Sequence, residues 1–330
     1  MWARAPHLAG TTGLSRYYDF GDGLTPESLQ DEGAVQRKAV GYFASHPELA
    51  GRYVAQRKEG EAGGPYDPSY TVEVCDAAAP PKDHAACEAK TTVHLTSEYY
   101  KGDRAMRESG FDISFRFGPY SAGTHHFAPV CLNSLLYKTE KDLEGMARVL
   151  GRGHEAAQWH ERAEARAAKM RELFWDAARG QFFDYDFEAG KRSDYEFATT
   201  FFPLWSGWAT PEQARVLEQH LSVFERAGGV VTSTRETGVQ WDSPYGWAPL
   251  QLIAAEGLRN YKFDADADRI SLKFLSTVLE NFQREGNIRE KYNVVTRSSE
   301  VNVSAGYQMN VIGFGWTNGV FLALLDRLPK

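Results

Sequence analysis

The sequence predicts a mostly α-helical protein whose helices pair into hairpins, with strands confined to the connecting loops. Three observations support this class: long segments repeat apolar residues at helical spacing, strand-like alternation occurs only in short runs, and no linker of changed composition divides the chain. Its 330 residues, 42 % of them hydrophobic, suffice for one large domain. We therefore expect a single domain over residues 1–330, an all-α toroid of helical hairpins whose rim loops shape a concave site.

The predicted helices combine apolar periodicity with start signals. In residues 27–44, Pro26 and early acidic residues precede later cations, as the helix dipole favours. Residues 128–150 and 154–175 each place their apolar side chains on one recurring face. Further helices are predicted at residues 195–206, 211–227, 244–260, 264–285 and 315–328.

Two segments lack a helical pattern. Residues 179–191, RGQFFDYDFEAGK, alternate in a way that predicts a small hairpin. Residues 58–93 are rich in Gly, Pro, Asp and Ala, so we expect a long irregular loop there. Cys75 and Cys87 could pair within it in an oxidising compartment or stay thiols in the cytosol. His84 is their only nearby partner, so the segment indicates no metal site.

Composition and charge exclude several classes of protein. The 37 Lys and Arg against 44 Asp and Glu leave a net charge of −7, which argues against a nucleic-acid binder. No stretch approaches the roughly 18 apolar residues that span a bilayer. The opening MWARAPHLAG lacks the apolar core of a signal peptide, and the localisation stays open between periplasm or secretion and cytoplasm. We expect a monomer that needs no cofactor or metal and binds a small molecule.

The segment RESGFDISFRF, residues 107–117, places a carboxyl group among aromatic side chains. Asp112 lies between two phenylalanines, and Gly110 lets the backbone approach a ligand closely. Desolvation raises the pKa of such a carboxyl group, which suits a general acid near neutral pH, whereas contact with Arg107 or Arg116 would oppose the shift. The alternative for Asp112 is a helix cap after a glycine turn.

The segment GVQWDSPYGWAPLQ, residues 238–251, joins apolar platforms to hydrogen-bonding groups. Trp241 and Trp247 can stack on the faces of a sugar ring, and Gln240 and Asp242 can bind its hydroxyls. The alternative is a helix start with two core tryptophans.

Two further segments carry candidate groups. In GNIREKYNV, Glu290 stands between Arg289 and Lys291, whose charges would keep a carboxylate ionised and suited to activate water as a base. The alternative is a solvated charge run at a helix end. GFGWTNGV, residues 313–320, lacks the GK[ST] ending of a phosphate loop and is typical of a tight helix N-terminus. Two carboxyl groups in contrasting settings, beside a tryptophan-rich segment, fit glycoside hydrolysis.

In this order the motifs resemble trehalase, glycoside hydrolase family 37. QWDSPYGWAPLQ is similar to that family's long QWD-P-GWAP signature, and ESGFDISFRF, REKYN and GFGWTNGV are similar to its other landmarks. LSRYYDFGDGLTPES, residues 14–28, resembles the segment leading to the family's Pro-Glu element. The resemblance therefore runs from about Leu14 to the C-terminus.

The resemblance implies a fold, an activity and roles for individual residues. It implies an (α/α)6 toroid that hydrolyses α,α-trehalose to two glucoses with inversion and without a metal. Asp112 would be the general acid and Glu290 the general base. The residues implied to line the pocket are Glu27, Gly110, Gln240, Trp241 and Asp242.

The chain departs from the family's pattern in several places. The PGGRF-E-YYWDSY and NRSQPP elements do not occur, Thr25 stands where the family has an arginine before Pro-Glu, and VNVSAGYQMNVI, residues 301–312, stands in place of a GGGEY stretch. We therefore expect the C-terminal part of a trehalase-like toroid, incomplete at its N-terminus. The alternatives are an inactive or sugar-binding remnant of that fold and an α-toroid glycosidase for another disaccharide.

Overall fold

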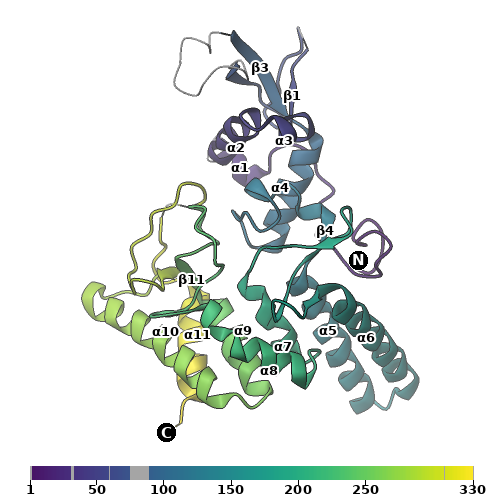
Figure 1. Ribbon diagram of the computed structural model, residues 1–330, viewed down its shortest axis with the longest axis vertical. Helices are drawn as coiled ribbons and strands as arrows, with labels where there is room; N and C mark the ends of the chain where they lie inside the picture. Colours follow the sequence, from purple (N-terminus) through teal and green to yellow (C-terminus); the bar gives the residue numbers. More distant parts are fainter. Residues whose placement is uncertain (1, 31–32, 59, 75–88, 308, 330) are drawn as a thin grey trace. The chain divides into compact units, whose positions relative to one another are not determined.

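The computed structural model describes residues 2–30, 33–58, 60–74, 89–307 and 309–329 (Figure 1). In these residues, helices form most of the regular structure, and the strands are short and belong to five small sheets. The predicted class, helical with small hairpins and long loops, is confirmed. Among the described residues, no helix is both long and apolar enough to cross a bilayer.

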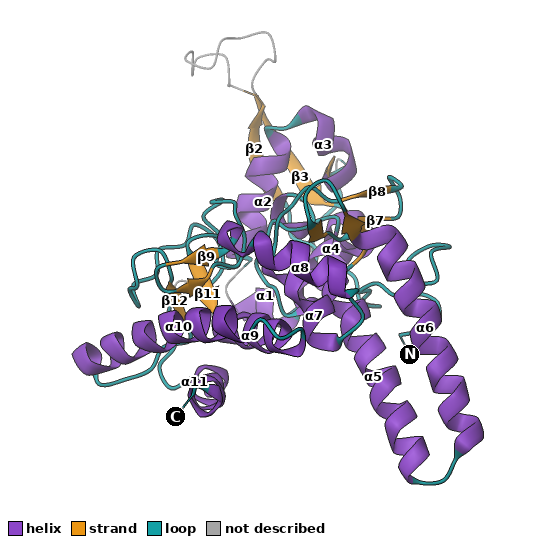
Figure 2. Cartoon of the chain, turned by 60° about the horizontal axis from the view of Figure 1, so that its bottom comes forward, coloured by secondary structure: helices purple, strands orange, loops and turns teal. Residues whose placement is uncertain are grey.

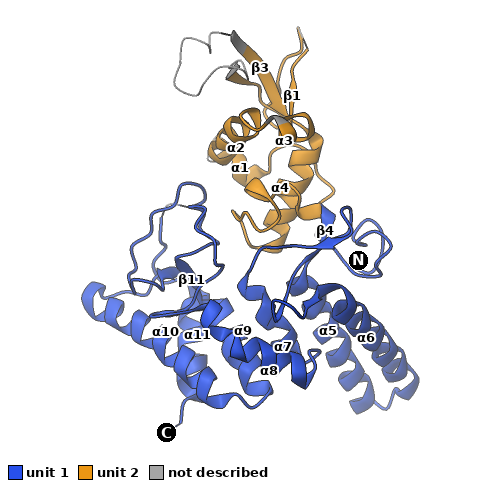
Figure 3. Ribbon diagram, viewed as in Figure 1, with its two compact units in different colours: residues 1–17, 126–330 blue, residues 18–125 orange. Residues whose placement is uncertain are grey.

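The chain forms two compact units, residues 18–125 and residues 1–17 with 126–330 (Figure 3). The single domain over residues 1–330 stays a prediction, and each unit is described by itself.

The unit of residues 18–125 combines short helices with a three-stranded antiparallel sheet. Its strands are β1 (Val54–Gln56), β2 (Tyr70–Val74) and β3 (Ala89–Leu95), in the order β1-β3-β2. Its helices are α1 (Pro26–Gln30), α2 (Ala34–Ala44), α3 (Pro47–Tyr53) and α4 (Ser97–Ser109).

The irregular loop expected over residues 58–93 is wrong in part, because β2 and most of β3 lie within it. Tyr70, Thr71 and Val72 pair with Val93, Thr92 and Thr91. The aromatic and β-branched residues of both segments favour a strand. The two segments are far enough apart in the sequence that their pairing could not be predicted from it. Cys75, His84 and Cys87 lie outside the described residues.

Two further helix predictions need correction in this unit. The helix expected over residues 27–44 is two helices, since Gly33 takes a left-handed conformation (φ 66°) just before α2. Helix α4 was not predicted. It begins where the hydroxyl of Thr96 accepts a hydrogen bond from the backbone N–H of Tyr99. Gly102 lets it pack closely, because a Cβ there would lie 1.8 Å from the carbonyl oxygen of Ala122.

The other unit contains the long hairpin of α5 (Val130–Val149) and α6 (Gly153–Phe174), which lie side by side in Figures 1 and 2. Both helices agree with the sequence prediction to within two residues. The predicted hairpin at 179–191 is two small pairings: β5 (Trp175–Asp176) pairs with β6 (Gln181–Phe182), and β7 (Tyr185–Asp186) pairs with β8 (Lys191–Arg192) and β4 (Phe127–Ala128).

Three further helices of this unit, α7 (Phe202–Ser206), α10 (Asp264–Glu285) and α11 (Gly315–Arg327), pack against α9 (Ala248–Asn260). The expected helix over 211–227 ends earlier, as α8 (Pro211–Gln219), and is followed by β9 (Glu225–Arg226) and β10 (Gly229–Val230). Short 3-10 helices occupy Ala198–Phe201 and Leu221–Val223 in this unit, Pro119–Ser121 in the other unit, and Thr124–His126 where the two meet in the sequence.

Strand pairing shortens the helix expected over residues 244–260. Its first residues form β11 (Tyr245–Trp247), which pairs antiparallel with β12 (Lys291–Asn293). This pairing joins the GWAP segment to the EKYN segment and brings Trp247 opposite Lys291.

Candidate active site

The predicted site residues form two groups, one in each unit. Glu27, Gly110 and Asp112 belong to residues 18–125. The second group, in the other unit, consists of Gln240, Trp241, Asp242 and Glu290.

Asp112 lies in the loop that follows α4. Gly110 ends this helix in a left-handed conformation, with φ at 76°. After α4, the next helix among the described residues begins at Pro119, seven residues beyond Asp112, so the helix-cap alternative for Asp112 is wrong. Asp112 is half-buried in this loop and does not cap a helix.

Burial raises the pKa of Asp112 to about 6, although the nearby Arg107 guanidinium opposes the shift. The aromatic surroundings of Asp112 in the sequence predicted a raised pKa, and Arg107 is one of the two arginines expected to oppose that rise. The other, Arg116, is buried with its guanidinium 5.3 Å from the ring centre of Phe111 and 4.7 Å from that of Phe117. A carboxyl group that titrates near pH 6 can hold the proton that a general acid delivers.

Arg107 also joins Glu27 to α4. Its Nη1 lies 3.0 Å from Glu27 Oε2, and its Nε lies 3.2 Å from Asp103 Oδ2. Asp103 is completely buried and also accepts a hydrogen bond from Gln36 Nε2 at 3.4 Å. The arginine therefore links Glu27 with the electrostatic surroundings of Asp112, across 80 residues of sequence.

Glu290 is buried and lies against a buried ammonium group. Its Oε2 is 2.8 Å from Lys291 Nζ; Glu290 is 8 % exposed and Lys291 is inaccessible. The solvated-charge alternative is therefore wrong. Arg289, the other flanking cation, turns to Glu285 Oε2 at 3.1 Å. The backbone oxygen of Glu290 accepts hydrogen bonds from Trp316 Nε1 and Thr317 Oγ1. Both donors lie in the first turn of α11, whose start at Gly315 confirms the helix N-terminus predicted for residues 313–320.

A cluster of three tryptophans lies against the Glu290–Lys291 pair through Trp247 and Trp316. Trp241 and Trp247 stack with centroids 3.8 Å apart, and Trp316 meets Trp247 edge-on at 5.7 Å. Lys291 Nζ lies 4.7 Å from the centre of the Trp247 ring. Both stacked rings are buried, as the core-tryptophan alternative expects. The pocket-lining role of Trp241 stays a prediction.

Gln240 and Asp242, the neighbours of Trp241, form hydrogen bonds with other residues of the protein. Gln240 Oε1 accepts a hydrogen bond from the backbone N–H of Tyr307 at 3.3 Å, and the Gln240 carbonyl accepts one from Trp247 Nε1 at 2.9 Å. Asp242 is completely buried. Their role in lining a pocket is likewise untested.

A ring of hydroxyl groups holds Asp242. The Tyr195 hydroxyl lies 2.7 Å from both carboxylate oxygens, the Ser233 hydroxyl donates to Oδ1 at 2.7 Å, and the Thr237 hydroxyl donates to Oδ2. Burial raises the pKa of Asp242 above its ordinary value, and these hydrogen bonds oppose the shift. No sequence motif indicates these three donors. Ser233 and Thr237 lie shortly before Asp242 in the chain, whereas only folding brings Tyr195 to it, across 47 residues.

A surface cleft of about 590 Å³ lies beside β11. It is lined by none of the predicted site residues but by Pro244, Tyr245, Asn293, Glu300, Val301 and Asn302.

Comparison with known proteins identifies the family. The family model described as Trehalase matches residues 41–329. A probable trehalase from Eremothecium gossypii is 32% identical over 98% of this chain and 43% of its own length. The cytosolic neutral trehalase of Beauveria bassiana is 31% identical over 98% and 44%. Among solved structures, neutral trehalase from Saccharomyces cerevisiae matches with a TM-score of 0.72 at 30% identity, covering 100% of this chain and 55% of that one.

The chain thus spans about half the length of the trehalases that it matches. The likeness to a solved trehalase along the whole chain confirms the predicted fold class, the α-toroid built from helical hairpins. The QWD-P-GWAP segment, the EKYN segment and the family match agree, and the chain belongs to the trehalase family.

Proposed function

We propose that this chain carries the acid and the base of an inverting glycoside hydrolase that cleaves α,α-trehalose into two glucose molecules. The observation that carries the proposal is the contrast between two carboxyl groups. Burial raises the pKa of Asp112 to about 6, whereas Glu290 lies against the ammonium of Lys291. Such a contrast separates a proton donor from a proton acceptor. The family and the names of its matched relatives support trehalose as the substrate.

In this mechanism Asp112 protonates the glycosidic oxygen as the bond to the anomeric carbon breaks. Glu290 takes a proton from a water molecule, whose oxygen attacks the same carbon from the opposite face. Inversion then yields one glucose as the β anomer, while the departing glucose keeps its α configuration. The mechanism needs the two carboxyl groups about 6.5–9.5 Å apart, to leave room for the water.

The other predicted residues would bind the sugar around these groups. Glu27 and Gly110 would do so beside Asp112, and Gln240, Trp241 and Asp242 beside Glu290. Burial of the last three in the free chain means that they would act through an opening at the site or by shaping its wall. Lys291 would hold the Glu290 carboxylate in its orientation through their ion pair.

The test is glucose release from trehalose by the purified chain, compared with Asp112→Asn and Glu290→Gln. We expect each variant to lose about 10²–10⁴-fold in kcat, the usual contribution of a positioned acid or base. Asp142→Asn and Glu172→Gln, which change exposed carboxylates paired with Lys138 and Lys169, are the matched controls. Proton NMR of the fresh products reports the anomers.

Each alternative has its own outcome in the same assay. Trehalose binding without glucose release would identify a sugar-binding remnant of the fold. Release from another disaccharide, but not from trehalose, would identify a different α-toroid glycosidase. Equal activity in the wild-type chain and both variants would reject the assigned acid and base.

A further inference from the structure

Asn310 holds the peptide groups on both sides of Lys291. Its Oδ1 accepts a hydrogen bond from the Lys291 N–H at 3.1 Å, and its Nδ2 donates to the Lys291 carbonyl at 2.9 Å. One carboxamide therefore satisfies both backbone polar groups of the residue that follows Glu290. Its Nδ2 also donates to the Ser299 carbonyl at 2.7 Å.

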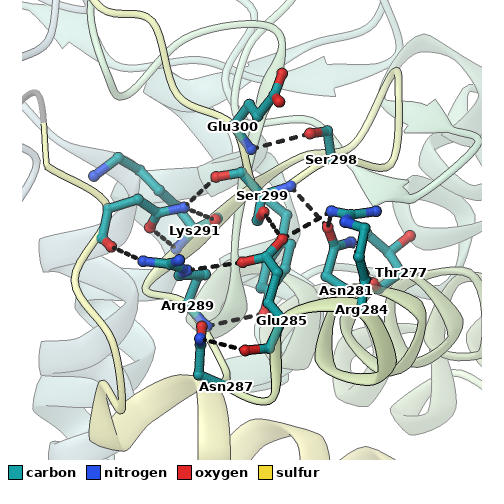
Figure 4. Close-up of polar contacts among 12 residues, drawn as sticks. Thr277, Asn281, Arg284, Glu285, Asn287, Arg289, Lys291, Ser298, Ser299 and Glu300 are labelled. Carbon is teal, nitrogen blue, oxygen red and sulfur yellow. Dashed lines mark hydrogen bonds and ion pairs between the residues drawn. The ribbon is translucent and has the colours of Figure 1, made fainter.

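Ser299 is in turn bound to the end of α10 (Figure 4). Its N–H donates to Asn281 Oδ1 at 3.0 Å, and its hydroxyl donates to Glu285. Glu285 also lies 3.1 Å from Arg289 Nε and 2.8 Å from Arg284 Nη2. Burial would raise the pKa of Glu285, but these hydrogen bonds outweigh it and leave the pKa below its ordinary value. The network thus stays charged at neutral pH.

A second set of contacts ties the same stretch to the residues before α11. The Glu290 N–H donates to the Val311 carbonyl at 2.9 Å, and Arg289 Nη1 donates to the Asn310 carbonyl at 3.2 Å. Residues 289–291 are therefore held from α10 on one side and from residues 310–311 on the other. The backbone that carries the Glu290 side chain has little freedom to shift.

We propose that Asn310 is a positioning residue for Glu290. The inference rests on the proposed role of Glu290 as the general base. Asn310 fixes the main chain of Lys291. The Lys291 ammonium in turn binds Glu290 Oε2 at 2.8 Å and so fixes the orientation of the carboxylate. Asn310 belongs to residues 301–312, the stretch in which this chain departs from the family's pattern, so that stretch serves the base by anchoring it.

The test compares Asn310→Ala and Asn310→Asp with matched changes at Asn260. The alanine variant removes all three side-chain hydrogen bonds, and the aspartate variant keeps only the acceptor for the Lys291 N–H. Asn260 is the control because its Nδ2 also donates to two carbonyls, those of Leu204 at 3.2 Å and Trp205 at 3.0 Å. The readouts are kcat and KM on trehalose, tryptophan fluorescence, and hydrogen exchange at the Lys291 amide.

We expect both Asn310 variants to lose about 10- to 100-fold in kcat, since a displacement of about 1 Å at a catalytic group costs this much. KM should stay within about twofold, because Asn310 itself binds no substrate in this scheme. The Lys291 amide should exchange faster in the alanine variant, which removes its acceptor, and should stay protected in the aspartate variant, which keeps it. The emission of the tryptophans near the Lys291 ammonium should change in both variants. The Asn260 variants should leave kcat, the Lys291 amide and the emission as in the wild type.

The outcome that overturns the proposal is an Asn310→Asp variant whose kcat matches that of Asn260→Asp. Should the alanine variant fail to fold, the aspartate variant carries the same comparison. A wild-type chain that releases no glucose would contradict the proposed function instead. In that case the exchange and fluorescence measurements still show whether Asn310 anchors Lys291, so the two failures are distinguishable.

Discussion

Asp112 and Glu290 show how a single side chain takes its chemistry from its neighbours. Both carboxyl groups have cations nearby, but burial dominates at Asp112 and raises its pKa to about 6 although the Arg107 guanidinium opposes the shift. At Glu290 the adjacent ammonium is itself buried and lies at hydrogen-bond distance. Electrostatic interactions strengthen where water is excluded, so local burial separates the two roles.

The Arg107 guanidinium sets how far the pKa of Asp112 rises. Its charge lowers that pKa against the effect of burial. Arg107→Leu should therefore raise the pKa further and keep the acid protonated to higher pH. We expect the basic limb of the kcat/KM profile to move up by about one pH unit or more. Arg107→Lys, which keeps a positive charge, is the control; an unmoved limb in the leucine variant would contradict the prediction.

Asp112 should also lower stability above pH 6. Its pKa is about 6 in the folded chain against an ordinary 3.8, so the folded state binds the proton more strongly between these values. The chain is therefore most stable, as far as Asp112 is concerned, while this group is protonated, and it loses stability as pH rises from about 3.8 to about 6. Asp112→Asn should stabilise the chain at pH 7.5, on the order of 1 kcal/mol after allowance for partial exposure, and not at pH 3.5. Thermal denaturation at both pH values checks this.

The Tyr195 hydroxyl should contribute more stability than an ordinary buried hydroxyl, because its acceptor, Asp242, is a buried carboxyl group. We expect Tyr195→Phe to cost about 1.5–3 kcal/mol. Tyr261→Phe, which loses a hydrogen bond to the neutral carbonyl of Ala209, should cost about 0.5–1.5 kcal/mol. Urea denaturation measures both, and equal costs would show that Asp242 does not depend on Tyr195.

At the scale of elements, the α5–α6 hairpin depends on a buried ion pair. Arg166 on α6 binds Glu140 on α5 through two hydrogen bonds of 3.0 and 2.8 Å. It also donates to Asn133 Oδ1 at 3.1 Å, and Asn133 exchanges hydrogen bonds with the backbone of Ser15. The pair thus joins the two helices and an N-terminal segment.

Breaking one side of that pair should be costly. Arg166→Met leaves the Glu140 carboxylate buried without its partner, and we expect a loss of about 3–5 kcal/mol. Adding Glu140→Met should recover most of it, because no unpaired charge remains. Denaturant unfolding of the single and double variants measures the coupling. A double variant as unstable as the single one would show that the charge itself is not the cause.

The success of the element predictions follows the length of each periodic pattern. Helices α5, α6, α10 and α11 each fill an uninterrupted pattern, and their bounds were predicted to within two residues. Two of the errors occur where another segment pairs with the chain. β11 replaces the start of an expected helix because residues 291–293 pair with it, and β2 and β3 pair within the expected loop.

At the scale of the whole molecule, the chain forms two compact units, each with one of the two proposed catalytic carboxyl groups. We expect it to be a monomer, and light scattering coupled to gel filtration should give a single species near 37.0 kDa. A dimer mass would contradict this expectation.

The sequence by itself determined the helical class, the family and the identity of the candidate acid and base, because periodicity and the order of motifs are local properties. Only the tertiary structure decided the surroundings of these groups. Arg107 reaches Glu27 across 80 residues, Lys291 meets Trp247 through a strand pairing, and Asn310 anchors Lys291. Burial and hydrogen bonding, which set the chemistry of a carboxyl group, arise between segments that are far apart in the chain.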